Sequence, residues 1–251
     1  MNNRFVFFLI LKDWIKRRIF RQSTSIRGTW ETTPGGFENM VEFLNWFDTT
    51  SSVEDTIAAA QRDWHYRFAS HVHFEKVAKK RSLEIGFGGG RLVAQAAKSF
   101  DEAVGVDIHQ AFDNTKCFLA LQNCENYRLV HRNDIESLKD GSVDFVYSFI
   151  VFQHFDSVEE VDFYLSQIER LLSDEGISHI YYGKSKDTDI QVTDDKNFVL
   201  RDCSLFVAPE AMKDLVGKRF EVLEYQDNLP KNPETRLGES GQARIVFRKK
   251  Y

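Results

Sequence analysis

The chain has 251 residues, a length that one domain with a cap explains better than two complete domains. A hydrophobic content of 42%, including 22 Phe and 4 Trp, is enough for a single buried core and argues against a disordered chain. The formal net charge of −5 gives no overall attraction to nucleic acid, which is therefore not an expected partner. The three cysteines have neither a zinc-ligand spacing nor the density of a secreted domain, so we expect reduced thiols in a cytoplasmic protein.

Residues 5–21 join a short apolar run to a basic stretch. The run is too short to span a bilayer, and no small-residue cleavage site follows it. At helical spacing, apolar side chains share one face and basic side chains share another, which predicts an amphipathic helix. This helix either lies on the inner face of a membrane or docks on the protein's own core or on a partner subunit. Liposome flotation of the full chain, compared with a chain that starts at Gln22, would separate these interpretations.

Residues 1–63 are predicted to form this helix and a set of cap helices. After a polar linker at 22–36, apolar spacing predicts one helix over residues 37–47. A second helix is predicted to begin at a capping box made by Ser51 and Glu54.

Four glycines separate a predicted strand from a predicted helix at residues 82–97. Glycine is needed where the backbone takes a positive φ or where a ligand approaches the main chain closely. The strand-to-helix context makes a nucleotide-like cofactor the leading explanation. A dinucleotide fingerprint is incomplete because Arg91 occupies the third glycine position, and no Gly-Lys-Ser/Thr triplet completes a P-loop.

The spacing Glu84-x-Gly86-x-Gly88-x-Gly90 resembles motif I of the class I S-adenosylmethionine-dependent methyltransferases. This resemblance covers residues 64–251. It implies an α/β fold with a doubly wound, Rossmann-like sheet of seven strands, mostly parallel with an antiparallel last strand, behind the N-terminal cap helices. It also implies S-adenosyl-L-methionine as the cofactor, with the loop main chain close to its methionyl end and Glu84 near its ammonium group.

Further cofactor residues follow from the same resemblance. Asp107, at the end of a predicted strand over 103–107, would accept hydrogen bonds from both ribose hydroxyls, unless it serves instead as a helix N-cap. Asp134 would meet the adenine amino group. The implied cofactor residues are Glu84, Gly86, Phe87, Gly88, Gly90, Asp107, Ile108, Asp134, Ile135, Ser148 and Phe149.

The later elements alternate between strand and helix. Strands are predicted at 127–131, 143–150, 177–182, 220–225 and 243–248, and helices from 158 to about 174 and at 211–216.

His154 is the candidate catalytic residue. Its ordinary pKa lies near neutrality, so it could take the proton from an alcohol or phenol as the oxygen attacks the methyl group. In the family that the sequence resembles, a histidine after this strand is the base in some members and only packs in others, and both interpretations stay open. The same resemblance implies that a cluster before the glycine loop lines the substrate cavity, and the alternative is that its aromatic rings seal the edge of the sheet. The cluster consists of Trp64, His65, Tyr66 and Arg67.

Two long connections, 184–200 and 227–242, are predicted to act as substrate loops. The first contains four aspartates, which favour a solvated acidic loop over a divalent metal site, so no metal ligand is assigned. The sequence predicts an S-adenosylmethionine-dependent methyltransferase that acts on a small molecule or glycan at a hydroxyl oxygen. The alternatives are a non-catalytic cofactor-binding or scaffold subunit with this fold and, less well matched because of Arg91, a dinucleotide oxidoreductase.

Overall fold

The computed structural model describes residues 30–31, 36–185, 190–192, 203–232, 234, 237–239 and 241–250. The predicted helix at residues 5–21 lies outside these ranges, as do most of the predicted linker and the four aspartates of the first substrate loop. Among the helices of the described ranges, none combines the length and the apolar character needed to cross a membrane.

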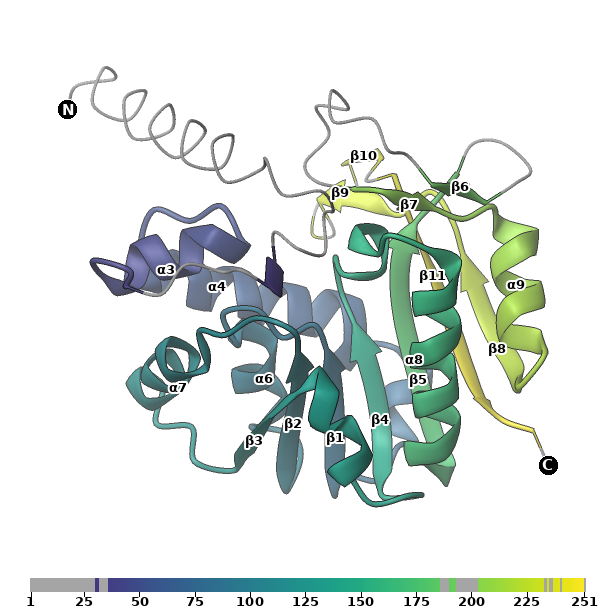
Figure 1. The fold of residues 1–251 in the computed structure, drawn as a ribbon, viewed down its shortest axis with the longest axis horizontal. Helices are drawn as coiled ribbons and strands as arrows, with labels where there is room; N and C mark the ends of the chain where they lie inside the picture. Colours follow the sequence, from purple (N-terminus) through teal and green to yellow (C-terminus); the bar gives the residue numbers. More distant parts are fainter. Residues whose placement is uncertain are drawn as a thin grey trace.

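A seven-stranded sheet forms the centre of the molecule (Figure 1). In spatial order its strands are β3 (Tyr127–His131), β2 (Glu102–Asp107), β1 (Arg81–Ile85), β4 (Val143–Ser148), β5 (Leu172–Gly183), β11 (Gln242–Lys249) and β8 (Phe220–Gln226). The strands from β3 to β5 pair in parallel, whereas β11 is antiparallel to both β5 and β8. The predicted doubly wound sheet with an antiparallel last strand is therefore confirmed.

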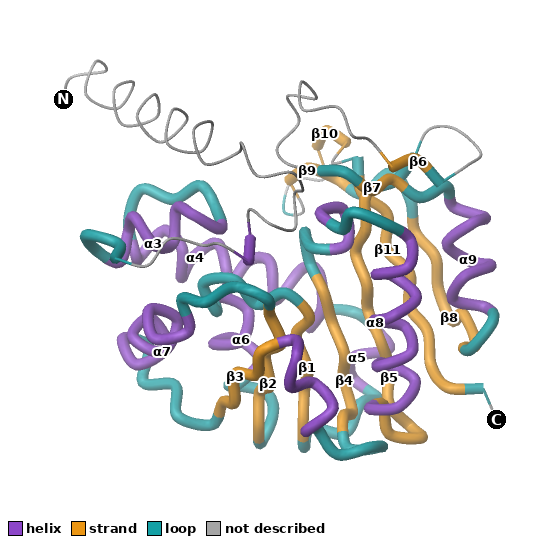
Figure 2. The backbone as a smooth tube through the Cα atoms, viewed as in Figure 1, coloured by secondary structure: helices purple, strands orange, loops and turns teal. Residues whose placement is uncertain are grey.

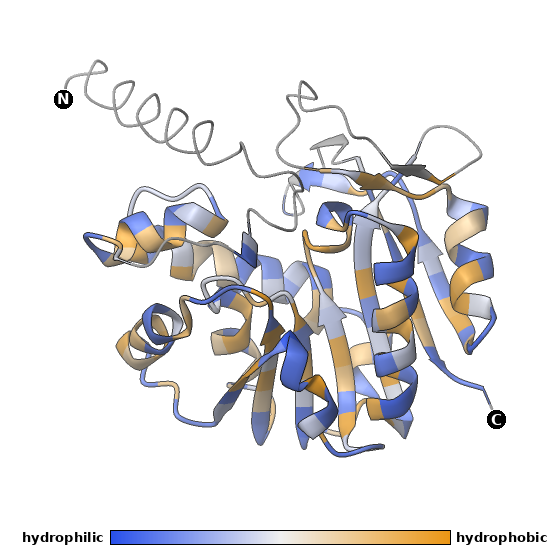
Figure 3. Cartoon of the chain, in the orientation of Figure 1, coloured by the Kyte–Doolittle hydropathy of each residue, from blue (hydrophilic) through white to orange (hydrophobic). Residues whose placement is uncertain are grey.

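Helices cover both faces of the sheet. The described helices are α3 (Met40–Phe47), α4 (Val53–Trp64), α5 (Val72–Glu75), α6 (Arg91–Ala96), α7 (Phe112–Leu121), α8 (Val158–Leu171) and α9 (Pro209–Gly217). One core cluster joins α8 and α9 to the first face, and another joins α4, α5 and α6 to the second. Hydrophobic and hydrophilic residues alternate around α8 and α9, as expected of helices with one buried face (Figure 3).

The cap packs over the edge of the sheet where the parallel strands end. A third, smaller cluster joins Phe43 and Leu44 of α3 to Phe118 of α7. Two small hairpins, β6 (Gln191–Val192) with β7 (Leu205–Phe206) and β9 (Pro230–Asn232) with β10 (Leu237–Glu239), lie at the same edge near the end of β5 (Figure 2). Each hairpin includes part of a predicted substrate loop.

Several predicted boundaries were wrong: β4 ends at Ser148 and not at residue 150, and β5 begins at Leu172 and not at residue 177. Two helix boundaries differ for a reason that the local contacts show. Helix α4 begins one residue later than the proposed capping box, because the Ser52 side chain, rather than that of Ser51, accepts the hydrogen bond from the Asp55 N–H. This choice lets the Thr56 hydroxyl donate to Thr50 Oγ1 at 2.8 Å. Helix α8 ends at Leu171 instead of near residue 174, because the chain enters β5 at Leu172 and pairs there with β4.

Asp144 joins the beginning of β4 to the beginning of β1. Its Oδ2 accepts hydrogen bonds from the main-chain N–H groups of Lys80 (3.2 Å) and Arg81 (3.1 Å), and its Oδ1 accepts one from the Ser173 hydroxyl (3.1 Å). These bonds lie at the end of the sheet opposite the glycine loop, so the role of Asp144 is structural.

We predict that Asp144→Ala lowers the free energy of unfolding by about 2 kcal/mol, because two main-chain donors lose their acceptor. Urea unfolding measures this change. Glu125→Ala, at an exposed position, is the control and should change stability by less than about 0.5 kcal/mol. Equal stabilities of the two variants would contradict the structural role of Asp144.

Candidate cofactor-binding site

The glycine loop between β1 and α6 has the backbone conformation that its sequence predicts. Gly86, Gly88 and Gly90 have positive φ values of 77°, 49° and 83°. At Gly90 a Cβ atom would also lie 2.7 Å from a methyl group of Thr115. The loop is therefore restricted to glycine both by its dihedral angles and by its close packing against α7.

The Asp107 carboxylate ties this loop to the end of β2. Its Oδ2 accepts a hydrogen bond from the Gly88 N–H at 2.7 Å, and its Oδ1 accepts one from the Ile108 N–H at 2.7 Å. Oδ1 also accepts a longer hydrogen bond from the His109 N–H at 3.4 Å. The Asp107 side chain stays 12% exposed, and Oδ2 can accept a further hydrogen bond. The alternative role as a helix N-cap is wrong, because the N-cap residue of α7 is Ala111.

His109, which sequence reasoning missed, fixes the other side of the loop. Its Nδ1 accepts a hydrogen bond from the Ala111 N–H (3.0 Å), so its Nε2 carries the proton and donates to the Gly88 carbonyl (3.0 Å). Burial lowers the pKa of His109, which keeps the ring neutral. The Thr115 hydroxyl donates to the same carbonyl at 3.1 Å. Gly88 is thus held through both its N–H and its C=O.

Phe87 differs from its glycine neighbours because its side chain turns into the core. The ring is 3% exposed and contacts the rings of His109 and Phe112, with centroids 5.0 Å away in each case. A Cβ atom at Gly105 would lie 2.7 Å from this ring. A cofactor on the loop would therefore meet the main chain of Phe87.

Glu84 is buried beneath the loop. The Tyr147 hydroxyl donates a hydrogen bond to its Oε2 at 3.2 Å. Burial raises the pKa of Glu84 to about 8, although the nearby Arg91 opposes the shift. At neutral pH the free protein therefore holds Glu84 mainly in its protonated form, in which it complements an ammonium group less well than a carboxylate would.

The end of β4 approaches the glycine loop from the other side. The Ser148 hydroxyl donates to the Ile85 carbonyl at 2.9 Å, which joins the ends of β4 and β1. Ile150 has a φ of 62°, a rare value for a β-branched residue. Val151 packs against Gly86, where a Cβ atom would lie 2.3 Å from its side chain. The main chain at Ser148 and Phe149 therefore lies beside the loop.

Asp134 and Ile135 lie in a 3-10 turn (Arg132–Ser137) that follows β3 at the same edge of the sheet. Asp134 is exposed, whereas Ile135 is buried in the main core. The His131 ring is joined to the Ile108 carbonyl by a 3.1 Å hydrogen bond, so this turn lies next to the end of β2.

His154 ends a short 3-10 turn (Phe152–His154) after β4. Its ring meets the ring of Trp30 edge-on at 5.4 Å, and Trp30 stacks on Phe47 at 6.1 Å. Phe47 itself covers Gly88, where a Cβ atom would lie 3.0 Å from its ring. Two aromatic side chains of the cap thus connect the candidate base to the glycine loop.

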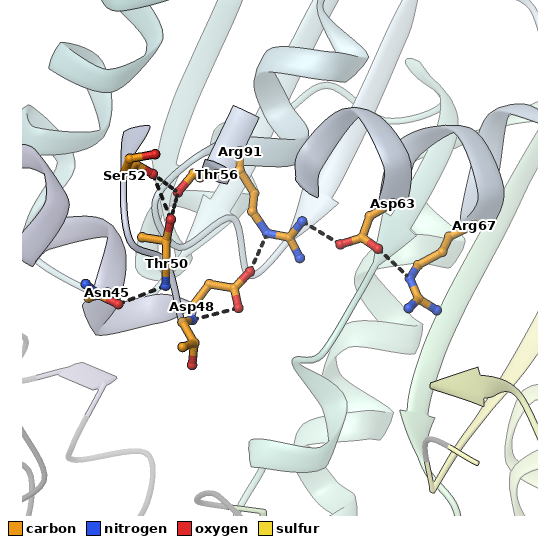
Figure 4. A network of polar contacts seen from close by, with 9 residues as sticks. Asn45, Asp48, Thr50, Ser52, Thr56, Asp63, Arg67 and Arg91 are labelled. Carbon is orange, nitrogen blue, oxygen red and sulfur yellow. Dashed lines mark hydrogen bonds and ion pairs between the residues drawn. The ribbon is translucent and has the colours of Figure 1, made fainter. Parts of the chain in front are cut away.

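A chain of ion pairs fastens the cap to the loop (Figure 4). Arg91, the first residue of α6, pairs through its Nε with Asp48 (3.2 Å) and through its Nη1 with Asp63 of α4 (2.7 Å). Asp63 also pairs with Arg67 at 3.1 Å. The residue that breaks the dinucleotide fingerprint is therefore an anchor for the cap.

No group of three or more His, Cys, Asp or Glu side chains that could hold a metal ion is present within the described ranges. The aspartates of the first substrate loop lie outside them.

Comparison with known proteins supports the class that this geometry indicates. Residues 83–180 match the family model described as a methyltransferase domain. No curated protein matches the sequence.

Three solved structures illustrate the similarity of the fold. The PH0226 protein from Pyrococcus horikoshii OT3 is 15% identical, with a TM-score of 0.59, covering 86% of this chain and 100% of that one. The 1,6-didemethyltoxoflavin-N1-methyltransferase from Burkholderia thailandensis, whose structure holds S-adenosylhomocysteine, is 19% identical, with a TM-score of 0.58 and coverages of 81% and 93%. The cyclase SpnF is 12% identical, with a TM-score of 0.55 and coverages of 78% and 81%.

The sheet order, the glycine loop and the matching domain define a class I methyltransferase fold. The resemblance to the class I S-adenosylmethionine-dependent methyltransferases is therefore confirmed.

We predict that Glu84 makes the protein less stable as the pH rises from about 4.5 to 8. The folded protein keeps the Glu84 proton up to about pH 8, whereas an ordinary glutamate releases it near 4.5. The folded state thus binds more protons in this interval, and its free energy of unfolding falls as the pH rises. Relative to Glu84→Gln, the wild type should lose on the order of 4 kcal/mol across the interval in urea unfolding. Parallel pH profiles of the two proteins would contradict the prediction.

Proposed function

We propose that the protein is an S-adenosylmethionine-dependent methyltransferase. The observation that carries the proposal is the Asp107 carboxylate, held by the Gly88 N–H at the edge where β1 and β2 end. An oriented, partly exposed carboxylate beside a glycine loop suits the two hydroxyls of a ribose. The matching methyltransferase domain supports S-adenosylmethionine over other nucleosides.

The site residues fit this cofactor. When bound, it supplies a methyl group activated by a sulfonium. Asp107 would hold the ribose, with Ile108, Asp134 and Ile135 on the adenine side. The main chain from Gly86 to Gly90 would receive the methionyl part, and Ser148 and Phe149 would border the methyl group.

The proposed acceptor is a small molecule or glycan that is methylated at a hydroxyl oxygen. His154 would take the hydroxyl proton, because a neutral imidazole can act as a general base near neutral pH. Its position after β4, on the acceptor side of the glycine loop, supports this role. The hairpins of the two substrate loops lie at the same edge and would contribute to specificity.

The proposal divides the chain into a cap, residues 1–63, and a methyltransferase domain, residues 64–251. The proposed location is the cytoplasm. We also propose contact with the inner face of a membrane, because residues 5–21 have a basic amphipathic pattern. The second candidate is a non-catalytic cofactor-binding or scaffold subunit with this fold, because an ordered cofactor loop does not by itself require methyl transfer.

We predict that S-adenosylmethionine and S-adenosylhomocysteine bind with micromolar affinity in calorimetric titration, and that NADH does not bind. Asp107→Ala should weaken both ligands at least about a hundredfold, because it removes the ribose acceptor and releases Gly88. Asp113→Ala, at an exposed position on α7, is the control and should leave both affinities unchanged. A wild-type protein that binds neither ligand would contradict the proposed function.

We predict that His154→Gln reduces methyl transfer from labelled S-adenosylmethionine about 10²- to 10⁴-fold, because the acceptor loses its general base. S-adenosylhomocysteine affinity should stay at the wild-type value. His73→Gln, at a ring that pairs with Glu224 of β8 at 3.5 Å, is the control and should leave turnover unchanged. Full turnover of the His154 variant would remove the base from the mechanism.

A further inference from the structure

Arg67 is a buried cation at the edge of the candidate site, and the cofactor assignment gives it no role. It lies in a π-helical turn (His65–Ala69) that continues α4, a type of turn that is frequent at functional sites. Its guanidinium lies 4.2 Å from the centre of the Phe149 ring and 5.8 Å from that of Tyr181. The Tyr181 hydroxyl donates a hydrogen bond to the main-chain carbonyl of Arg67 at 2.9 Å. The residue is therefore fixed against the ends of β4 and β5.

The guanidinium uses few of its donors. Its Nε donates to Asp63 Oδ1 at 3.1 Å, and within the described residues its two terminal nitrogens make no hydrogen bond. Both terminal nitrogens keep some contact with solvent-accessible space, because neither is a fully buried atom without a partner. A buried charge is normally fully paired, so a fork of free donors on a residue that is only 7% exposed indicates a place for a ligand.

The surrounding charges leave this end of the ion-pair chain positive. Asp63 is shared, because its Oδ2 pairs with Arg91 at 2.7 Å while its Oδ1 serves Arg67. Asp48 reaches Arg91, not Arg67, and is 42% exposed. Glu84 does not compensate, because burial keeps it mainly protonated at neutral pH. Figure 4 shows Arg67 on the far side of Asp63 from Arg91, at the end of the chain of ion pairs.

The sheet order places Arg67 away from the proposed ribose position. Asp107 and the glycine loop follow β2 and β1, whereas Arg67 lies over Phe149, which follows β4, and Tyr181, which belongs to β5. From β2 to β5 the order is β2, β1, β4, β5, so Arg67 is beyond the proposed methyl position as seen from the ribose.

We propose that Arg67 binds an anionic group of the methyl acceptor, a carboxylate or a phosphate, so that the substrate is an anionic hydroxyl compound. The planar fork of a guanidinium matches both groups in a two-point hydrogen bond. The Phe149 and Tyr181 rings hold the plane of the fork in place. This inference rests on the proposed function and adds the charge of the substrate to it.

The test compares two probes of nearly the same shape, the anionic 3-hydroxybenzoate and the neutral 3-hydroxybenzamide, titrated into protein saturated with S-adenosylhomocysteine. The wild type should bind the carboxylate at least about tenfold more tightly than the amide. Arg67→Gln should remove this preference while leaving S-adenosylhomocysteine affinity unchanged. Arg67→Lys, which keeps the charge and loses the fork, should retain a reduced preference. Arg62→Gln, at an exposed position of α4, should behave as the wild type.

Three results would overturn the inference. The first is that the wild type binds both probes equally, or neither of them at millimolar concentration. The second is that Arg67→Gln keeps the preference; if that variant does not fold, an unreduced preference in Arg67→Lys counts in the same way. The third is that Arg67→Gln lowers the affinity for S-adenosylhomocysteine but not for 5′-methylthioadenosine, which lacks the amino-acid carboxylate. Arg67 would then bind the carboxylate of the cofactor. Failure of the wild type to bind S-adenosylhomocysteine is a failure of the proposed function, and the probe preference can still be measured on the free protein.

Discussion

The hydrogen bond between the Asp107 carboxylate and the Gly88 N–H is the contact on which the rest of the site depends. It joins the end of β2 to the loop after β1, so the two elements that would hold a nucleoside cannot move independently. His109 and Thr115 hold the opposite side of the same residue through its carbonyl. Because the loop has no side chains of its own at its glycines, its shape comes from these neighbours.

The cap is organised around the same loop. Arg91 begins α6 directly after the last glycine and pairs with acids of the cap at 3.2 and 2.7 Å, while Phe47 packs on Gly88. Charge and apolar contact therefore place the cap over the loop together. The cap also brings Trp30 to His154, and the turn that continues α4 brings Arg67 to Phe149, so the acceptor side is bordered from the same direction. A cap held in this way would link the position of the acceptor groups to the geometry of the glycine loop.

Much of the fold could be predicted from the sequence, because strand and helix periodicities are strong over residues 81–183. Strand β3 has the predicted ends, and the antiparallel β11 is where the family resemblance placed it. The start of α4 was predicted one residue too early because tandem serines offer two N-caps, and in the structure it is Ser52 that accepts the hydrogen bond from the Asp55 N–H. The roles of His109 and Trp30 could not be predicted, and for Arg67 the sequence left open whether it lines the cavity, because these roles come from contacts between segments far apart in the chain. Spacing alone has no signal for such contacts.

The most direct test of this account is a crystal structure of the protein with S-adenosylhomocysteine. The account predicts both ribose hydroxyls within hydrogen-bond distance of Asp107, with the Asp107 bond to the Gly88 N–H retained, and the methionyl part along the main chain of residues 86–90. A ligand bound elsewhere, or a ribose held by other residues while Asp107 faces away, would contradict it.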